Sequence, residues 1–296
     1  MNSRKCIGAI TALITPFKAD GSVDVEALRG LVRFQIDSGI HGIVPCGSTG
    51  EAATMNPAEY RLVVQTVVEE AKGAVPIIAG AGSNDTKKAI EFSQIAHECG
   101  ADALLHVNPY YNKPTPDGLF AHFQAIAQNT PLPIIIYNVP GRTGLNMKAE
   151  TVIRIAQGIP QVVGIKEASG DINQMADIIR GAPKGFLMLS GDDSMTLPSM
   201  ALGGVGCISV VSNEIPKEFS QMVSAALKGD WEEAKRLHFE WLDLMQINFI
   251  ESNPIPVKAA LAMMGKIQEV YRLPMCKITD ASREVLTQVL KRHGLV

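Results

Sequence analysis

The sequence predicts an α/β fold: a TIM (β/α)8 barrel with a C-terminal helical extension. Eight short apolar runs recur along the chain at intervals of roughly 25 to 35 residues, and amphipathic segments lie between them. After the eighth run the strand-like pattern stops and only helical segments follow. A chain of 296 residues has room for one barrel of about 250 residues and an extension.

The eight apolar runs are predicted to be parallel strands. Their apolar residues are continuous and do not alternate with polar ones. Continuous apolarity is typical of strands that are buried on both faces, as in a parallel sheet covered by helices. The runs lie near residues 7–14, 42–46, 76–80, 103–107, 133–138, 162–166, 186–190 and 206–210.

The segments between the runs have apolar residues at helical spacing, which predicts the helices of the barrel. These helices are expected at Val25–Ser38, Pro57–Lys72, Thr86–Cys99, Gly118–Gln128, Lys148–Gln157, Ile172–Arg180 and Ser194–Leu202.

Beyond the eighth strand, further helices are expected at Lys217–Lys228, Trp231–Phe249, Pro256–Met264 and Ala281–His293. We therefore assign residues 1–224 to the catalytic barrel and residues 225–296 to the helical extension.

Composition excludes several classes of partner. The formal net charge is -3, and basic and acidic residues are interspersed, so nothing indicates a nucleic-acid or membrane-surface site. No uncharged apolar stretch reaches the ~18 residues needed to span a bilayer. Five widely spaced cysteines, an odd number, suit reduced core residues better than a disulfide framework. We therefore expect a cytoplasmic protein.

In a TIM barrel the chemistry lies at the carboxyl ends of the strands, so the residues there are the informative ones. Lys166 ends the sixth run and Tyr137 ends the fifth. An ammonium in apolar surroundings loses hydration, which favours the neutral amine, and a neutral amine can condense with a carbonyl. A solvated or salt-bridged lysine is the alternative, because Glu167 follows directly.

Three other strand ends carry polar groups. After the second run comes Gly47–Glu51, a turn of small residues whose N–H groups and the hydroxyls of Ser48 and Thr49 could hold a carboxylate. It could also be an ordinary helix-entry turn. The fourth run is followed by the paired aromatics Tyr110 and Tyr111, which could equally be packing residues.

The fifth strand end also supplies Arg142, whose guanidinium suits bidentate binding of a carboxylate, with a plain surface charge as the alternative. Asp192 and Asp193 follow the seventh run and are interpreted as turn and capping residues, with possible contact to substrate. His106 lies inside its strand and is interpreted as a core group or a residue behind the site.

We expect neither a metal nor a cofactor. The histidines form no spaced ligand cluster near the strand ends, and no dinucleotide or Walker motif is present. Glycines 203, 204 and 206 precede the eighth strand, on the face opposite to the usual phosphate site of barrels, which argues against a phosphorylated substrate or pyridoxal phosphate.

An amine, a phenol, an anion-binding turn and a guanidinium together suit a 2-oxo acid. The amine of Lys166 would attack the keto carbon, the turn at Ser48 and Thr49 would hold the carboxylate, and Tyr137 would move protons. The protonated imine would then acidify the adjacent methyl group and give an enamine nucleophile.

The motifs at the strand ends resemble those of the 4-hydroxy-tetrahydrodipicolinate synthase family, over nearly the whole chain. The segments that carry the resemblance are 47–51, 110–114, 137–144, 164–168, 189–193, 206–210 and 253–258.

The resemblance implies a lyase of the class I aldolase type, which condenses pyruvate with L-aspartate 4-semialdehyde in lysine and diaminopimelate biosynthesis. Lys166 would form the imine, and Tyr137, Ser48 and Tyr111 would form a proton relay, with Tyr111 reaching into a neighbouring subunit.

By the same resemblance, Thr49 and the backbone of Ile208 would contact pyruvate, and Arg142 would hold the carboxylate of the semialdehyde. The implied assembly is a homotetramer, a dimer of tight dimers with Tyr110 and Tyr111 at the tight interface.

Two features differ from the usual family pattern. The relay hydroxyl is more often a threonine, and Ser48 lacks the methyl group that restricts the rotamer. Lysine-inhibited members have a histidine and an acid where this chain has Pro57 and Lys88, so we expect weak or absent inhibition by lysine.

The alternative activity is that of another pyruvate-dependent Schiff-base aldolase or dehydratase, such as an N-acetylneuraminate lyase; Arg142 and Tyr110–Asn112 argue against a sugar acid. A barrel that only binds a small acid or scaffolds partners is the non-enzymatic alternative.

Overall fold

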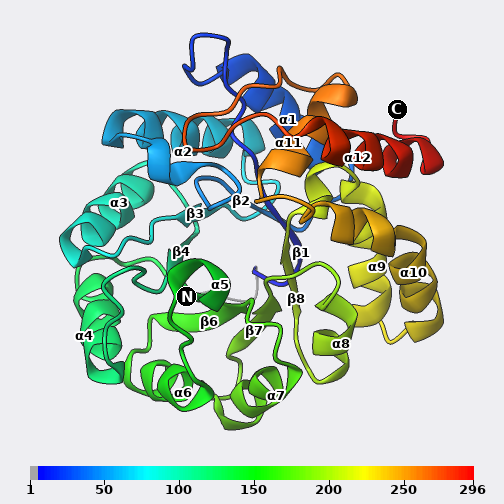
Figure 1. The fold of residues 1–296 in the computed structure, drawn as a ribbon. Coiled ribbons are helices and arrows are strands. Elements are labelled where there is room, and N and C mark those ends of the chain that lie inside the picture. The colour runs from blue at the N-terminus through cyan, green and yellow to red at the C-terminus, as the bar shows by residue number, and fades with distance from the viewer. Residues whose placement is uncertain (1–5) are drawn as a thin grey trace.

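A computed structural model describes residues 6–296, and its strands form one parallel sheet in the order β2-β1-β8-β7-β6-β5-β4-β3 (Figure 1). The strands are β1 Gly8–Ala12, β2 Gly42–Val44, β3 Ile78–Gly80, β4 Ala103–Val107, β5 Ile134–Asn138, β6 Val162–Glu167, β7 Leu187–Ser190 and β8 Gly206–Ser209. The eight predicted strands are confirmed.

The two end strands of this order, β2 and β3, close the sheet into a barrel. The Ile43 N–H donates to Pro76 O (3.1 Å), and the Gly80 N–H donates to Pro45 O (2.9 Å). The backbones approach so closely here that a Cβ on Gly80 would lie 2.2 Å from the Cys46 carbonyl oxygen. Glycine is therefore the residue that permits this closure, and the predicted TIM barrel is confirmed.

A ring of helices surrounds the strands, and each predicted helix of the barrel is present to within two residues at either end. Several begin at a residue whose side chain accepts a hydrogen bond from the first turn, as at Asn56, which forms a capping box with Glu59. The helices are α1 Val25–Asp37, α2 Pro57–Ala71, α3 Thr86–Glu98, α4 Pro116–Ala127, α6 Ala149–Gly158, α7 Ile172–Gly181 and α8 Thr196–Ala201.

The core has two layers, one inside the barrel and one between the strands and the helices. Along β5, Ile134 and Ile136 belong to the outer layer, whereas Ile135 and Tyr137 belong to the inner one. Because both layers are apolar, the strand sequence is continuous in apolar residues, as expected for a covered parallel sheet.

The C-terminal part contains α9 Pro216–Leu227, α10 Trp231–Ile247, α11 Ile255–Met263 and α12 Asp280–Arg292, as predicted. Helix α9 packs on both β1 and α10. It spans the predicted domain boundary between residues 224 and 225, so this boundary stays a prediction. Helix α11 packs against α12, and α12 packs against α10. Arg272, in the segment between α11 and α12, forms an ion pair with Glu59 of α2.

Three short elements were not predicted: the helix α5 Pro140–Thr143 and the 3-10 helices η2 Ala52–Thr54 and η3 Val211–Asn213. Each is too short to show helical periodicity in the sequence. Helix α5 directly follows β5 and η3 directly follows β8, whereas η2 comes after the turn Gly47–Glu51 that follows β2. All three follow carboxyl ends of strands, on the side of the barrel where the site forms. Within residues 6–296, no helix is long and apolar enough to cross a bilayer.

Candidate active site

Lys166 and Tyr137 are direct partners on neighbouring strands. Their Cα atoms are paired in the register of β5 with β6, so both side chains project into the barrel. The Lys166 Nζ lies 4.4 Å from the centroid of the Tyr137 ring. Both residues are buried, Lys166 at 5% exposure and Tyr137 at 8%. The structure thus brings together the amine and the phenol that the sequence singles out.

The adjacent acid, Glu167, points to the opposite side of β6. Asn138 Nδ2 donates to its two carboxylate oxygens at 3.1 and 3.0 Å, Gln174 Nε2 donates at 3.1 Å, and the Ser169 N–H donates at 2.7 Å. In residues 6–296 no carboxylate lies within 4.0 Å of Lys166 Nζ. The salt-bridged alternative for Lys166 is therefore wrong.

The turn Gly47–Glu51 closes on itself and leaves two donors available. The Gly50 N–H donates to Gly47 O and the Glu51 N–H donates to Ser48 O, both at 3.1 Å. Within the described part of the chain, the N–H groups of Ser48 and Thr49 meet no acceptor. Two neighbouring free N–H groups beside a cavity can bind a carboxylate.

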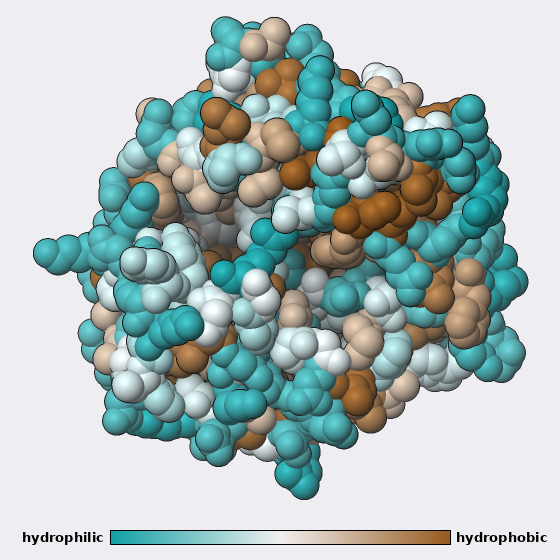
Figure 2. Space-filling view, in the orientation of Figure 1, coloured by the Kyte–Doolittle hydropathy of each residue, from teal (hydrophilic) through white to brown (hydrophobic). Residues whose placement is uncertain are grey.

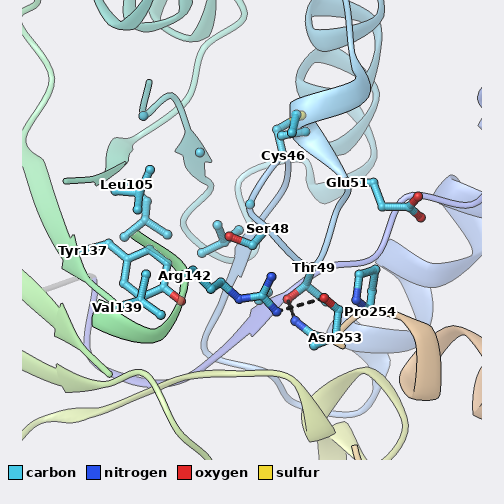
Figure 3. A pocket seen from close by; sticks show the side chains of 18 of the residues that line it. Cys46, Ser48, Thr49, Glu51, Leu105, Tyr137, Val139, Arg142, Asn253 and Pro254 are labelled. Carbon is cyan, nitrogen blue, oxygen red and sulfur yellow. Dashed lines mark hydrogen bonds between the residues drawn. The ribbon is translucent and has the colours of Figure 1, made fainter. Parts of the chain in front are cut away.

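Tyr137, Ser48 and Thr49 border one cavity of about 550 Å³ at the carboxyl ends of the strands. Figure 2 shows a hollow near the centre of this face of the molecule. In the close view of Figure 3, Tyr137, Ser48, Arg142 and Thr49 surround the same space. The lining also includes Lys166 and, toward the rim, Tyr110. A volume of this size holds a small metabolite.

Arg142 lies on α5 and is held by the C-terminal part of the chain. Its Nη2 donates to the Asn253 carbonyl oxygen at 2.9 Å, while Asn253 Nδ2 donates to Thr49 Oγ1 at 3.0 Å (Figure 3). Sequence reasoning gave Asn253 no role, and its only signal was its place in the segment 253–258. This residue joins the guanidinium to the carboxylate-binding turn.

Two predicted site residues lie away from the cavity in the single chain. Tyr111 is 89% exposed, has a backbone φ of 68°, and does not border the cavity, although its neighbour Tyr110 does. The side chain of Ile208 is buried in the inner core layer, and Val210 lines the cavity at that strand end. The roles of Tyr111 and Ile208 stay predictions.

The interpretation of Asp192 as a turn residue is confirmed, because its Oδ1 accepts from the N–H and hydroxyl of Ser194. Asp193 differs, since it accepts from the N–H groups of Val210 and Val211 at the start of η3 and does not cap its own helix. His106 is a core residue, as expected; burial lowers its pKa to about 3, and its Nε2 lies 3.2 Å from Ser93 Oγ.

Comparison with known proteins identifies the family. The model of the dihydrodipicolinate synthetase family matches residues 5–293. The chain belongs to this family. A 4-hydroxy-tetrahydrodipicolinate synthase of Maridesulfovibrio salexigens is 53% identical over 289 residues, which are 98% of this chain and 99% of the relative.

Two solved structures of dihydrodipicolinate synthases have the same fold over their whole length. The chloride-inhibited enzyme of Acinetobacter baumannii, complexed with pyruvate, is 43% identical with a TM-score of 0.96, covering 98% of this chain and 99% of the other. A variant described as the first monomeric one is 41% identical with a TM-score of 0.97, covering 99% and 98%.

The family predicted from the motifs is thus confirmed, and so is the enzyme class, a lyase of the class I aldolase type. The relatives carry the name of the predicted activity, and they do not support the alternative of an N-acetylneuraminate lyase.

The acid Asp193 makes stability depend on pH. Its burial raises the pKa to about 6, from an ordinary value of 3.8. A carboxyl with a raised pKa stabilises the fold while it is protonated, and this contribution is lost as the pH rises from about 4 through about 6. The loss is on the order of 3 kcal/mol. Burial also raises the pKa of Glu214 well above its ordinary value.

In Asp193→Asn this loss is absent, because the amide keeps the acceptor oxygen and does not ionise. The melting temperature of the variant relative to wild type should therefore increase by roughly 5 °C between about pH 4.5 and pH 7. Differential scanning calorimetry at both pH values measures this. Parallel pH profiles for the two proteins would contradict the assignment.

Proposed function

We propose that this chain is a 4-hydroxy-tetrahydrodipicolinate synthase that condenses pyruvate with L-aspartate 4-semialdehyde through an imine at Lys166. The observation that carries this proposal is the buried Lys166 amine above the Tyr137 ring, without a carboxylate partner in the described part of the chain. An amine that is not tied up in an ion pair is available to attack a carbonyl.

In this proposal the carboxylate of pyruvate accepts hydrogen bonds from the free N–H groups of Ser48 and Thr49. This orientation leaves the keto carbon open to attack by the amine of Lys166 from inside the barrel. The Lys166 nitrogen forms a bond to that carbon, and the carbonyl oxygen leaves as water after two proton transfers. Tyr137, beside the amine, moves these protons, and Ser48, at the same cavity, continues the relay.

The imine acidifies the pyruvate methyl group, and loss of a proton gives an enamine. This nucleophile attacks the aldehyde carbon of the semialdehyde and forms the new carbon–carbon bond. The amino group of the semialdehyde then attacks the imine carbon, which closes the ring and releases Lys166 as the free amine. Arg142, at the cavity and held by Asn253, binds the carboxylate of the semialdehyde bidentately. The backbone at Ile208 completes the pyruvate site.

Lys166→Ala should abolish covalent capture of pyruvate, because the other lysine of the described lining, Lys88, is exposed at the cavity rim. Mass spectrometry after borohydride treatment with pyruvate should show a reduced adduct on the wild type and none on the variant, and kcat should fall at least about 10³-fold. The exposed Lys184→Ala is the matched control and should behave as wild type. Absence of an adduct on wild-type protein would refute the imine, and an assay with the semialdehyde then identifies the acceptor.

The proposed assembly rests on the family resemblance and on the exposed Tyr111. We propose a homotetramer, a dimer of tight dimers, in which Tyr110 packs at the tight interface and Tyr111 completes the relay of the neighbouring site. The high exposure of Tyr111 and its left-handed backbone support this, since an apolar ring on a constrained loop is seldom left in water. One similar structure is that of a monomeric variant of a dihydrodipicolinate synthase, so family membership alone does not fix the assembly.

Mixing two inactive variants tests this arrangement. Lys166→Ala lacks the amine, and Tyr111→Phe lacks the relay hydroxyl, which should lower kcat about 10²-fold. If Tyr111 acts across the interface, each mixed dimer has one intact site, so co-refolded equimolar chains should recover about a quarter of wild-type activity. No recovery, with mixed dimers present by native mass spectrometry, would place Tyr111 in its own subunit's site or outside catalysis.

The proposed compartment is the cytoplasm. Cys46, Cys99, Cys207 and Cys276 are free thiols, which supports a reducing environment.

Regulation by lysine is proposed to be weak or absent. Lys88 is exposed at the cavity rim, with its Nζ 5.6 Å from the Phe92 ring centroid. Pro57, the other position that differs from lysine-inhibited members, is the first residue of α2. The ammonium of Lys88 repels the amino groups of a lysine effector.

Activity should therefore stay constant as lysine is added through the submillimolar range, and Lys88→Glu should increase inhibition by replacing repulsion with attraction. Lys87→Glu, which changes the neighbouring exposed residue and does not border the cavity, is the control. Steady-state rates against lysine concentration measure the effect, and clear inhibition of the wild type below millimolar lysine would disprove the proposal.

A further inference from the structure

A fully buried cation in the C-terminal part has no role in the chemistry above. Lys258 lies in the apolar helix α11, and its exposure is 0%. Its Nζ is 2.6 Å from Glu51 Oε1 and 4.3 Å from the centroid of the Phe17 ring. Burial lowers the pKa of Lys258, and the adjacent Glu51 carboxylate opposes this shift. One carboxylate is thus the principal partner of this ammonium.

That carboxylate belongs to the last residue of the carboxylate-binding turn. Glu51 has a φ of 54°, in the left-handed region that residues other than glycine avoid. Its N–H donates to Ser48 O at 3.1 Å and so closes the turn, while its Oε2 accepts from the Arg272 N–H at 3.1 Å. Glu51 is therefore hydrogen-bonded directly to the backbone of Ser48 and, through its side chain, to the C-terminal part of the chain.

Stability alone does not account for such a pair. Removing two charges from water is costly, and replacing a buried ion pair by apolar residues of similar size is often neutral or stabilising. What the pair does supply is a fixed link between α11 and the turn. Asn253, just before this helix, makes a second link through its hydrogen bond to Thr49.

We propose that Lys258 and Glu51 are positioning residues: their ion pair holds Glu51 in the left-handed conformation and keeps the N–H groups of Ser48 and Thr49 directed into the cavity. This inference rests on the proposed function, which assigns those N–H groups to the carboxylate of pyruvate. Lys258 does not border the cavity, so any effect of its replacement on pyruvate binding must pass through the turn.

The double variant Glu51→Gln/Lys258→Met tests the inference. It removes both charges, nearly keeps the side-chain volumes, and leaves an amide oxygen for the Arg272 N–H. We expect a melting temperature close to that of wild type, borohydride capture of pyruvate at Lys166, and an increase of about tenfold in the pyruvate concentration for half-maximal capture. KM for pyruvate should rise by a similar factor, and kcat should change less.

Lys266→Met is the matched control. Lys266 lies in the same C-terminal part, half-buried with its Nζ 3.6 Å from the Phe34 ring centroid, and the substitution is the same. Half-maximal capture should occur at the wild-type pyruvate concentration. Lys258→Met alone is measured alongside, because Glu51 itself borders the cavity whereas Lys258 does not; it should raise the half-maximal pyruvate concentration in the same direction.

Two outcomes would overturn the inference. Wild-type pyruvate dependence in the double variant and in Lys258→Met would do so. A lowered melting temperature with an unchanged KM for pyruvate would also overturn it, because that is the result expected of a purely structural pair. Failure of the proposed function is distinguishable, because wild-type protein would then capture no pyruvate at all.

Discussion

The site depends on the register between β5 and β6. Ile134 pairs with Val162, but Ile135 pairs with Gly164, so β6 contains one extra residue at this point. Without this shift, Tyr137 would face Ile165, and Lys166 would not be its partner. A one-residue offset moves a side chain to the other face of a sheet. The irregularity therefore decides that an amine and a phenol meet inside the barrel.

Gly164 lies at this irregularity and also permits a close approach of β6 to its other neighbour, β7. A Cβ at this position would lie 2.7 Å from the Leu187 carbonyl oxygen on β7, so the backbone of β6 can approach β7 only without a side chain there. Downstream the alternation resumes, with Lys166 directed inward and Glu167 outward. Asn138 and Gln174 then satisfy the Glu167 carboxylate behind the barrel wall. The register shift therefore places the amine of Lys166 inside the barrel and the carboxylate of Glu167 on the opposite side of the strand.

Much of this arrangement was accessible from the sequence, since continuous apolar runs mark the strands and their ends mark the site. Sequence reasoning singled out in this way five residues that line the cavity: Lys166, Tyr137, Ser48, Thr49 and Arg142. The register shift was not, because a single extra residue inside an apolar run leaves the pattern unchanged. Short elements such as α5 contain too few residues for periodicity. Contacts between distant segments, such as Asn253 with Thr49, depend on tertiary packing that no local pattern encodes.

The C-terminal helices also belong to the site's construction. Asn253 contacts both Thr49 and Arg142, which lie at the ends of different strands, and it thereby fixes the distance between the two places where carboxylates are proposed to bind. Loops at strand ends are the most mobile parts of a barrel and gain precision only from what packs on them. The segment at Asn253 lies outside the (β/α)8 repeat, so it can contact the loops at two strand ends at once. A loop of the barrel itself is attached to its own strand and does not join two others in this way. The extension therefore provides an anchoring contact that the barrel repeat does not contain.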